Sequence, residues 1–139
     1  MGVRTLDASA EVWWRQAAHD LQAAQANLAT GMFDVALLMA QQAVEKALKA
    51  LYIAKLGQTP PRIHDIERLS RAVGVESDLH EQVFDLTDWY LEGRYPDLAD
   101  RPAFEKATEE IARDMLAHVD AALQKIRSEL DAAGNLPAS

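Results

Sequence analysis

The sequence contains no cysteine among its 139 residues. This absence excludes disulfides, thiolate catalysis and zinc sites built on cysteine, and it fits a protein of a reducing cytosol. The N-terminus has no basic segment followed by a continuous apolar run, and no stretch approaches the roughly 18 apolar residues of a membrane span. We therefore expect a soluble protein in the cytoplasm.

Basic residues are in short supply. Lys and Arg number 14 against 22 Asp and Glu, which gives a formal net charge of −8. Affinity for phosphate backbones comes from neutralising phosphates with Lys and Arg, so this balance disfavours tight non-specific binding to nucleic acid. We expect no DNA partner, and a nucleic-acid site would need a local basic patch or one assembled by oligomerisation.

Several catalytic and metal-binding motifs are also missing. The chain has no Walker A sequence, no Gly-x-Gly-x-x-Gly and no Gly-x-Ser-x-Gly elbow. A di-iron bundle needs paired Glu-x-x-His motifs, and none occurs. Asp114 and His118 would share a helix face, but two ligands make at best a weak metal site. We predict neither a metal nor a cofactor.

What is present is helical periodicity, most clearly from Gln41 to Leu51. One stripe there is apolar and contains Ala40, Ala43, Val44, Ala47, Leu48 and Leu51. On a helix this stripe faces a core, while Glu45, Lys46 and Lys49 fall largely off it. Adjacent opposite charges on a helix face are usually solvated and contribute little. We interpret this stretch as the central helix of the fold.

The same spacing extends over nearly the whole chain and shows no strand-like alternation. We expect helices at about 7–30, 33–57, 64–73, 76–91 and 100–133, with Gly31, Gly74 and Gly93 at helix ends and Gly57 opening a break before Pro60 and Pro61. The pattern predicts an all-α fold, an antiparallel up-and-down bundle of four long helices plus one short helix. A single domain over 1–139 is expected, with a core at about 7–133 and a frayed tail at 134–139.

Trp13 and Trp14 are adjacent and therefore point in two different directions on the first helix. One of them is expected in the core, and the other could lie against a partner. The simpler interpretation is that both are ordinary packing aromatics, because large aromatic side chains dominate core energetics.

Arg94 and Tyr95 stand in a constrained loop, since Pro96 forces Tyr95 towards an extended conformation. The planar fork of donors on an arginine suits a phosphate held in a fixed direction. The alternative is that Arg94 pairs with Asp97, Asp100 or a carboxylate on a neighbouring helix. The position alone leaves both interpretations open.

His64 and Asp65 follow the stiff Pro60-Pro61 pair and open the short helix. A histidine there could act as an acid, a base or a phosphate donor. It could equally cap the helix.

The sequence resembles the HEPN domain from about Trp13 to Leu130. The matching segments, in family order, are Trp14-x4-His19-Asp20-Leu21, Gly31 through Phe33-Asp34-x-Ala36, Gln42-Ala43-Val44-Glu45-Lys46-Ala47-Leu48-Lys49-Ala50, His64-Asp65-Ile66-x2-Leu69 and Arg94-Tyr95-Pro96-Asp97.

The resemblance implies a helical bundle that forms homodimers and is encoded beside a minimal nucleotidyltransferase, the two behaving like a toxin and antitoxin pair. Many members are metal-independent ribonucleases in which an arginine is followed four to six residues later by a histidine, the paired motifs meeting at the dimer interface. Here Arg94 matches that arginine, but the next histidine is His118.

Two functions follow from the resemblance. The first is a homodimeric binding subunit for a nucleotide or for the nucleotidyltransferase partner, with a site made of Arg94, Tyr95, Asp97, His64, Glu45, Lys46 and Lys49. The second is a ribonuclease toxin that acts on RNA through Arg94, with His64 or Tyr95 in support. The missing histidine and the acidity of the chain favour the first. On either hypothesis the polar face of the central helix becomes a wall of the site.

Overall fold

The computed structural model describes residues 7–134, which are helical and contain no strand. The expected all-α class is confirmed. The elements, with 3₁₀ turns labelled η, are α1 (Ala8–Ala29), α2 (Phe33–Leu56), α3 (Ile66–Ala72), η1 (Glu76–Asp78), η2 (Glu81–Asp85), α4 (Leu86–Arg94), η3 (Pro96–Leu98), α5 (Ala103–Lys106) and α6 (Glu109–Gly134). Of the tail expected at 134–139, Gly134 is the last residue of α6, and 135–139 lie outside the described residues.

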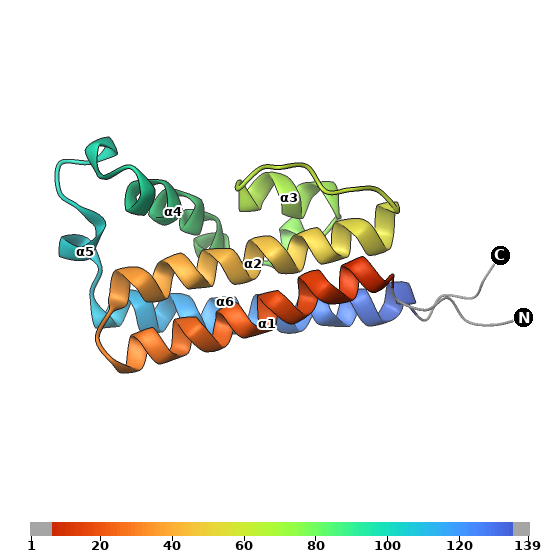
Figure 1. The fold of residues 1–139 in the computed structure, drawn as a ribbon, viewed down its shortest axis with the longest axis horizontal. Coiled ribbons are helices and arrows are strands. Elements are labelled where there is room, and N and C mark those ends of the chain that lie inside the picture. The colour runs from red at the N-terminus through yellow and green to blue at the C-terminus, as the bar shows by residue number, and fades with distance from the viewer. Residues whose placement is uncertain (1–6, 135–139) are drawn as a thin grey trace, which may run out of the picture.

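Three long helices, α1, α2 and α6, lie side by side and form the body of the molecule (Figure 1). α1 runs antiparallel to the other two, and α2 and α6 run parallel to each other. The intervening chain returns along the opposite side of α2 as a series of short elements. α2 packs against α1, α3, α4 and α6. The helix predicted from the stretch Gln41–Leu51 to be central therefore is the one that the other helices surround.

Small side chains bring the neighbouring helices close to α2. Its alanines at positions 36, 40, 43, 47 and 50 are fully buried. Three leucines on the same helix, Leu37, Leu48 and Leu51, are also fully buried and fill the space between the elements. Burying a leucine side chain contributes about 1.5–3 kcal/mol, so this helix supplies a large share of the core.

The expected fourth long helix, at 76–91, is wrong. The chain forms η1, η2 and α4 instead, with extended backbone at Leu79 and His80. The His80 side chain accepts a hydrogen bond from the backbone N–H of Gln82 and so starts a new turn. Four apolar or aromatic residues at helical spacing in this segment are nevertheless all buried, namely Leu79, Val83, Leu86 and Tyr90. The bundle therefore has three long helices and a segmented fourth side.

The expected start of the last helix at Asp100–Pro102 is also wrong. Pro102 precedes the four-residue α5, and the chain is extended again at Ala107. α6 begins at Glu109, after the hydroxyl of Thr108 accepts a hydrogen bond from the N–H of Ile111. As a consequence Phe104, the second residue of α5, does not join the buried face of the last helix and is 64% exposed.

Three of the four glycines expected at helix ends adopt the left-handed conformation, with φ of 83° at Gly31, 65° at Gly57 and 78° at Gly74. Gly93 does not, because α4 continues through it to Arg94. Its expected role as a helix stop is wrong.

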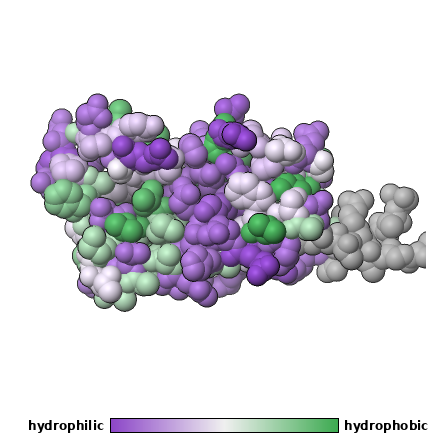
Figure 2. All heavy atoms as spheres, in the orientation of Figure 1, coloured by the Kyte–Doolittle hydropathy of each residue, from purple (hydrophilic) through white to green (hydrophobic). Residues whose placement is uncertain are grey.

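The surface in view carries polar side chains over its middle, and apolar ones both at the end that holds α5 and the turn between α1 and α2 and towards the opposite end (Figure 2). Large exposed apolar residues are Met32 in the turn between α1 and α2, Leu98 at the end of η3 and Phe104 in α5. Within residues 7–134 no helix combines the length and the apolar character needed to cross a membrane.

Candidate functional site

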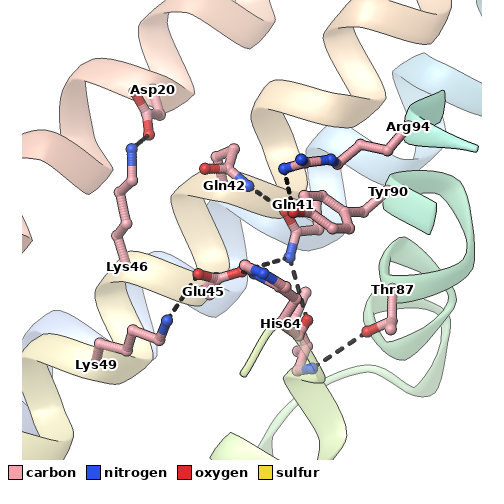
Figure 3. A network of polar contacts seen from close by, with 11 residues as sticks. Asp20, Gln41, Gln42, Glu45, Lys46, Lys49, His64, Thr87, Tyr90 and Arg94 are labelled. Carbon is pink, nitrogen blue, oxygen red and sulfur yellow. Dashed lines mark hydrogen bonds and ion pairs between the residues drawn. The ribbon is translucent and has the colours of Figure 1, made fainter. Parts of the chain in front are cut away.

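One polar face of α2 is covered by the start of α3 and by α4. Gln41, Glu45 and Lys49 lie one turn apart on this face and point towards those elements (Figure 3). Their exposed fractions are 0%, 4% and 5%. Charged side chains are almost never buried to this degree unless they are paired. The sequence-based interpretation of Glu45 and Lys49 as solvated surface charges is therefore wrong.

Glu45 is the centre of this network. Its Oε2 accepts a hydrogen bond from Lys49 Nζ at 2.9 Å, and its Oε1 accepts one from Gln41 Nε2 at 2.9 Å. His64 Nδ1 lies 2.9 Å from the same Oε1. Burial raises the pKa of the Glu45 carboxyl, but the hydrogen bonds from Lys49, Gln41 and His64 outweigh it and leave the pKa below its usual value. Glu45 is thus ionised at neutral pH and balances the charge of Lys49.

His64 is fixed on one side and open on the other. Nδ1 faces Glu45, and the side chain is 49% exposed. A histidine with one ring nitrogen on a carboxylate has a defined orientation and leaves Nε2 for a ligand or a proton. The cap of α3 is supplied by Asp65, whose side chain accepts the N–H of Arg68 at 3.1 Å. The alternative role of His64 as the cap is wrong.

Tyr90 joins His64 to Arg94. It is 4% exposed, and its ring centroid lies 4.7 Å from that of His64. Its hydroxyl accepts a hydrogen bond from Arg94 at 2.9 Å, and the Arg94 guanidinium carbon lies 5.6 Å from the tyrosine ring centroid. Across residues 7–134 no carboxylate lies within ion-pair distance of Arg94. The expected alternative, in which Arg94 pairs with Asp97 or Asp100, is not found.

Sequence reasoning does not assign Tyr90 or Gln41 to the site. The apolar pattern places Tyr90 only in a buried stripe, although it precedes Arg94 by four residues, the spacing at which two side chains meet on a helix. Gln41 precedes Glu45 by the same spacing. The spacing of four residues is thus the sequence feature from which a contact of Tyr90 with Arg94, and of Gln41 with Glu45, could have been predicted.

Other predicted site residues lie elsewhere. Lys46 Nζ pairs with Asp20 Oδ2 of α1 at 2.7 Å, and Asp20 is 2% exposed. Tyr95 and Asp97 follow the end of α4 and are exposed. Tyr95 has the Arg94 guanidinium carbon 6.0 Å from its ring centroid, but within the described part of the chain neither residue hydrogen-bonds to Glu45, His64 or Tyr90.

The two tryptophans both pack partly against the core. Lys49 Nζ lies 5.7 Å from the Trp13 ring centroid, and the guanidinium carbon of Arg127 lies 5.4 Å from that of Trp14. The adjacent side chains therefore face α2 and α6 respectively.

We name the set of Gln41, Glu45, Lys49, His64, Tyr90 and Arg94 the Glu45 cluster. Its buried ion pair is neutral, so its net positive charge lies on Arg94 and, when protonated, on His64. This arrangement can hold a phosphate, and it can present His64 Nε2 as an acid or a base.

In the described range 7–134, no three His, Asp or Glu side chains gather in a way that could hold a metal ion. His118, which the sequence pairs with Asp114 as at best a weak metal site, stacks on His80 with ring centroids 3.7 Å apart.

Comparisons with known proteins agree with the sequence resemblance. The family model described as HEPN domain matches residues 10–129. The crystal structure of TT1696 from Thermus thermophilus is similar to this chain with 32% identity and a TM-score of 0.75, and the match covers 86% of this chain and 97% of that one.

A second solved structure is similar in fold. ST0689, described as an archaeal HEPN homologue, has 24% identity and a TM-score of 0.66, and the match covers 87% of this chain and 97% of that one. No curated protein matches. With the family model matching most of its length, the chain belongs to the HEPN domain family.

Proposed function

We propose that this chain is a homodimeric HEPN binding subunit that holds the phosphate of a nucleotide at the exposed end of the Glu45 cluster. A minimal nucleotidyltransferase protein is its partner, in a toxin–antitoxin-like pair. The observation that carries the nucleotide part is that Tyr90 contacts both Arg94 and His64, which holds a guanidinium and an imidazole against the same tyrosine.

Phosphate binding is favoured by the state of Arg94. Its charge has no carboxylate partner in the described residues, and the hydrogen bond to Tyr90 restricts where the guanidinium points. A guanidinium that is already positioned loses less entropy when it binds a phosphate oxygen. His64 packs against the ring of Tyr90 and adds a second donor. The dimer and the partner are supported by membership of the family alone.

Calorimetry with ATP and GTP tests the nucleotide part. Arg94→Ala should weaken binding at least tenfold, because a charge-assisted hydrogen bond is worth about 1.5–3 kcal/mol. Arg113→Ala is the matched control: this exposed arginine of α6 pairs with Glu109 away from the cluster, and its loss should leave the affinity unchanged. Absence of heat with both nucleotides would contradict this part.

The partner is tested separately. The product of the neighbouring reading frame, if it carries the Gly-Ser and Asp-x-Asp pattern of a nucleotidyltransferase, should bind the full chain in a calorimetric titration. A neighbouring gene without that pattern, or no binding between the two purified proteins, would remove the partner from the proposal.

A metal-independent ribonuclease is the second candidate, and the contact between His64 and Glu45 favours it. A half-exposed histidine oriented by a buried carboxylate can take a proton from a ribose 2′-hydroxyl through Nε2, and Arg94 can stabilise the charge that develops on the phosphate. RNA cleavage without added metal, lost in His64→Ala and in Arg94→Ala with helicity intact, would establish this function in place of simple binding.

A further inference from the structure

A cavity of about 540 Å³ adjoins the Glu45 cluster on the side towards the start of α1. Its walls come from the first turns of α1, the last turns of α2 and the loop that joins α2 to α3. The lining side chains that matter here are Trp13, Lys49, Ile53, Pro60, Pro61 and Arg62.

We propose that this cavity takes the base of the nucleotide whose phosphate Arg94 and His64 hold, with the base lying against the ring of Trp13. The inference rests on the proposed function, since it assigns the other half of the same ligand. The expected ligand class is a nucleotide with a purine-sized base.

The size and lining of the cavity suit such a group. Small-molecule sites are usually clefts of about 300–1,000 Å³ with mostly apolar walls and a few polar groups. Trp13 offers an aromatic face, and the Pro60-Pro61 pair and Ile53 offer apolar surface. Stacking of a base on an aromatic side chain is worth about 1–3 kcal/mol.

Lys49 connects the cavity to the cluster. It lines the cavity, its Nζ lies 5.7 Å from the Trp13 ring centroid, and the same nitrogen donates to Glu45 at 2.9 Å. Along the chain, Arg62 lines the cavity only two residues before His64. The cavity and the Glu45 cluster therefore share Lys49 as a common wall.

The charges set the direction of the ligand. Asp7 lines the cavity at the start of α1 and accepts hydrogen bonds from Ser9. Its carboxylate disfavours a phosphate at that end. Arg62 lines the cavity from the loop that leads to α3, and Arg94 lies beyond it at the end of α4, so the phosphate faces that way and the base faces α1.

Nuclear magnetic resonance of the full chain tests the cavity directly. The sequence has three tryptophans, Trp13, Trp14 and Trp89, so three indole N–H signals can be assigned by single substitution. Titration with adenosine, which has no phosphate, should shift the Trp13 signal and leave the other two in place. Adenosine shifts confined to Trp14 or Trp89, or no shift at all, would overturn the base site.

Affinity for adenosine monophosphate separates this proposal from the one on which it rests. Trp13→Leu should weaken binding about tenfold, and Trp14→Leu, the neighbouring substitution that faces α6, should change it less than twofold. If Arg94→Ala weakens binding while Trp13→Leu binds like the wild type, the base site fails and the phosphate site stands. If Trp13→Leu weakens binding and Arg94→Ala does not, the cavity stands and the phosphate assignment fails.

Circular dichroism of each variant reports whether it folds. If Trp13→Leu does not fold, the signals are assigned from Trp14→Leu and Trp89→Phe, and the adenosine titration of the wild type still decides the matter.

Discussion

Glu45 shows how a buried charge becomes tolerable at the scale of one residue. Its two carboxylate oxygens have three partners, from α2 itself and from the loop before α3. A buried ion pair seldom adds much net stability, but removing one member leaves the other charge without compensation. The cluster is therefore sensitive to the loss of any single charged member.

Glu45→Gln should destabilise the protein by about 3–5 kcal/mol, because it leaves Lys49 buried without a counter-charge. Urea denaturation at neutral pH measures this difference. Glu109→Gln is the control, since the pair of Glu109 with Arg113 is exposed and such pairs contribute about 0–1 kcal/mol. Equal stability of the two variants would show that the pair is not buried in solution.

The same carboxylate gives a pH dependence. The pKa of Glu45 is lowered in the folded protein from a reference of 4.5, so its contribution to stability is complete above that value and is lost as the pH falls through the folded pKa. The stability difference between the wild type and Glu45→Gln should shrink when denaturation is repeated below the reference value. A difference that is constant over the acid range would contradict the lowered pKa.

At this scale the sequence predicts the identity of several site residues but not their environment. Glu45, Lys49, His64 and Arg94 are assigned through the family resemblance. Their burial and contacts depend on how α3 and α4 cover α2, which periodicity along one helix cannot report. Lys46 shows the converse, because its neighbour across the helix interface, Asp20, draws it away from the cluster.

At the scale of elements, the long helices are predictable and the segmented side is not. α1 and α2 begin and end within about two residues of their expected bounds. The stripe through Leu79, Val83, Leu86 and Tyr90 suits one long helix, but 3₁₀ turns followed by α4 bury the same side chains. The backbone is extended at Leu79 and His80, and the His80 ring accepts the N–H of Gln82 where the next turn starts; a hydrophobic pattern does not contain that hydrogen bond.

Substitution of two glycines, Gly57 and Gly93, tests the backbone conformation that the structure gives to the ends of α2 and α4. Gly57→Ala should cost about 1–2 kcal/mol, because its φ of 65° is unfavourable for a residue with a Cβ atom. Gly93→Ala should instead be neutral or stabilise by up to about 1 kcal/mol, since Gly93 is helical and a Cβ there meets nothing within 4 Å. Thermal denaturation of both variants measures these two changes in stability. A loss of stability in Gly93→Ala similar to that in Gly57→Ala would be inconsistent with the structure.

At the scale of the whole molecule, apolar side chains remain exposed at the end of the bundle that holds α5. Met32, Leu98 and Phe104 are each at least half exposed. Contiguous exposed apolar surface is typical of protein–protein contacts. This feature is compatible with the homodimer proposed from family membership.

Light scattering at micromolar concentration tests the dimer. The expected mass is twice that of the 15.4 kDa chain. A mass near that of one chain would refute the dimer and leave the nucleotide site to be judged by calorimetry alone.

The central position of α2 has a consequence for the way the site opens. Amide protons of a helix that is packed on several sides exchange with solvent only when the whole protein unfolds, while short peripheral elements open locally at a lower free-energy cost. Glu45 and Lys49 belong to the first class. His64 lies outside any helix and Arg94 is the last residue of α4, so they belong to the second. The amide protons around His64 and Arg94 should therefore exchange with solvent before those of Glu45 and Lys49.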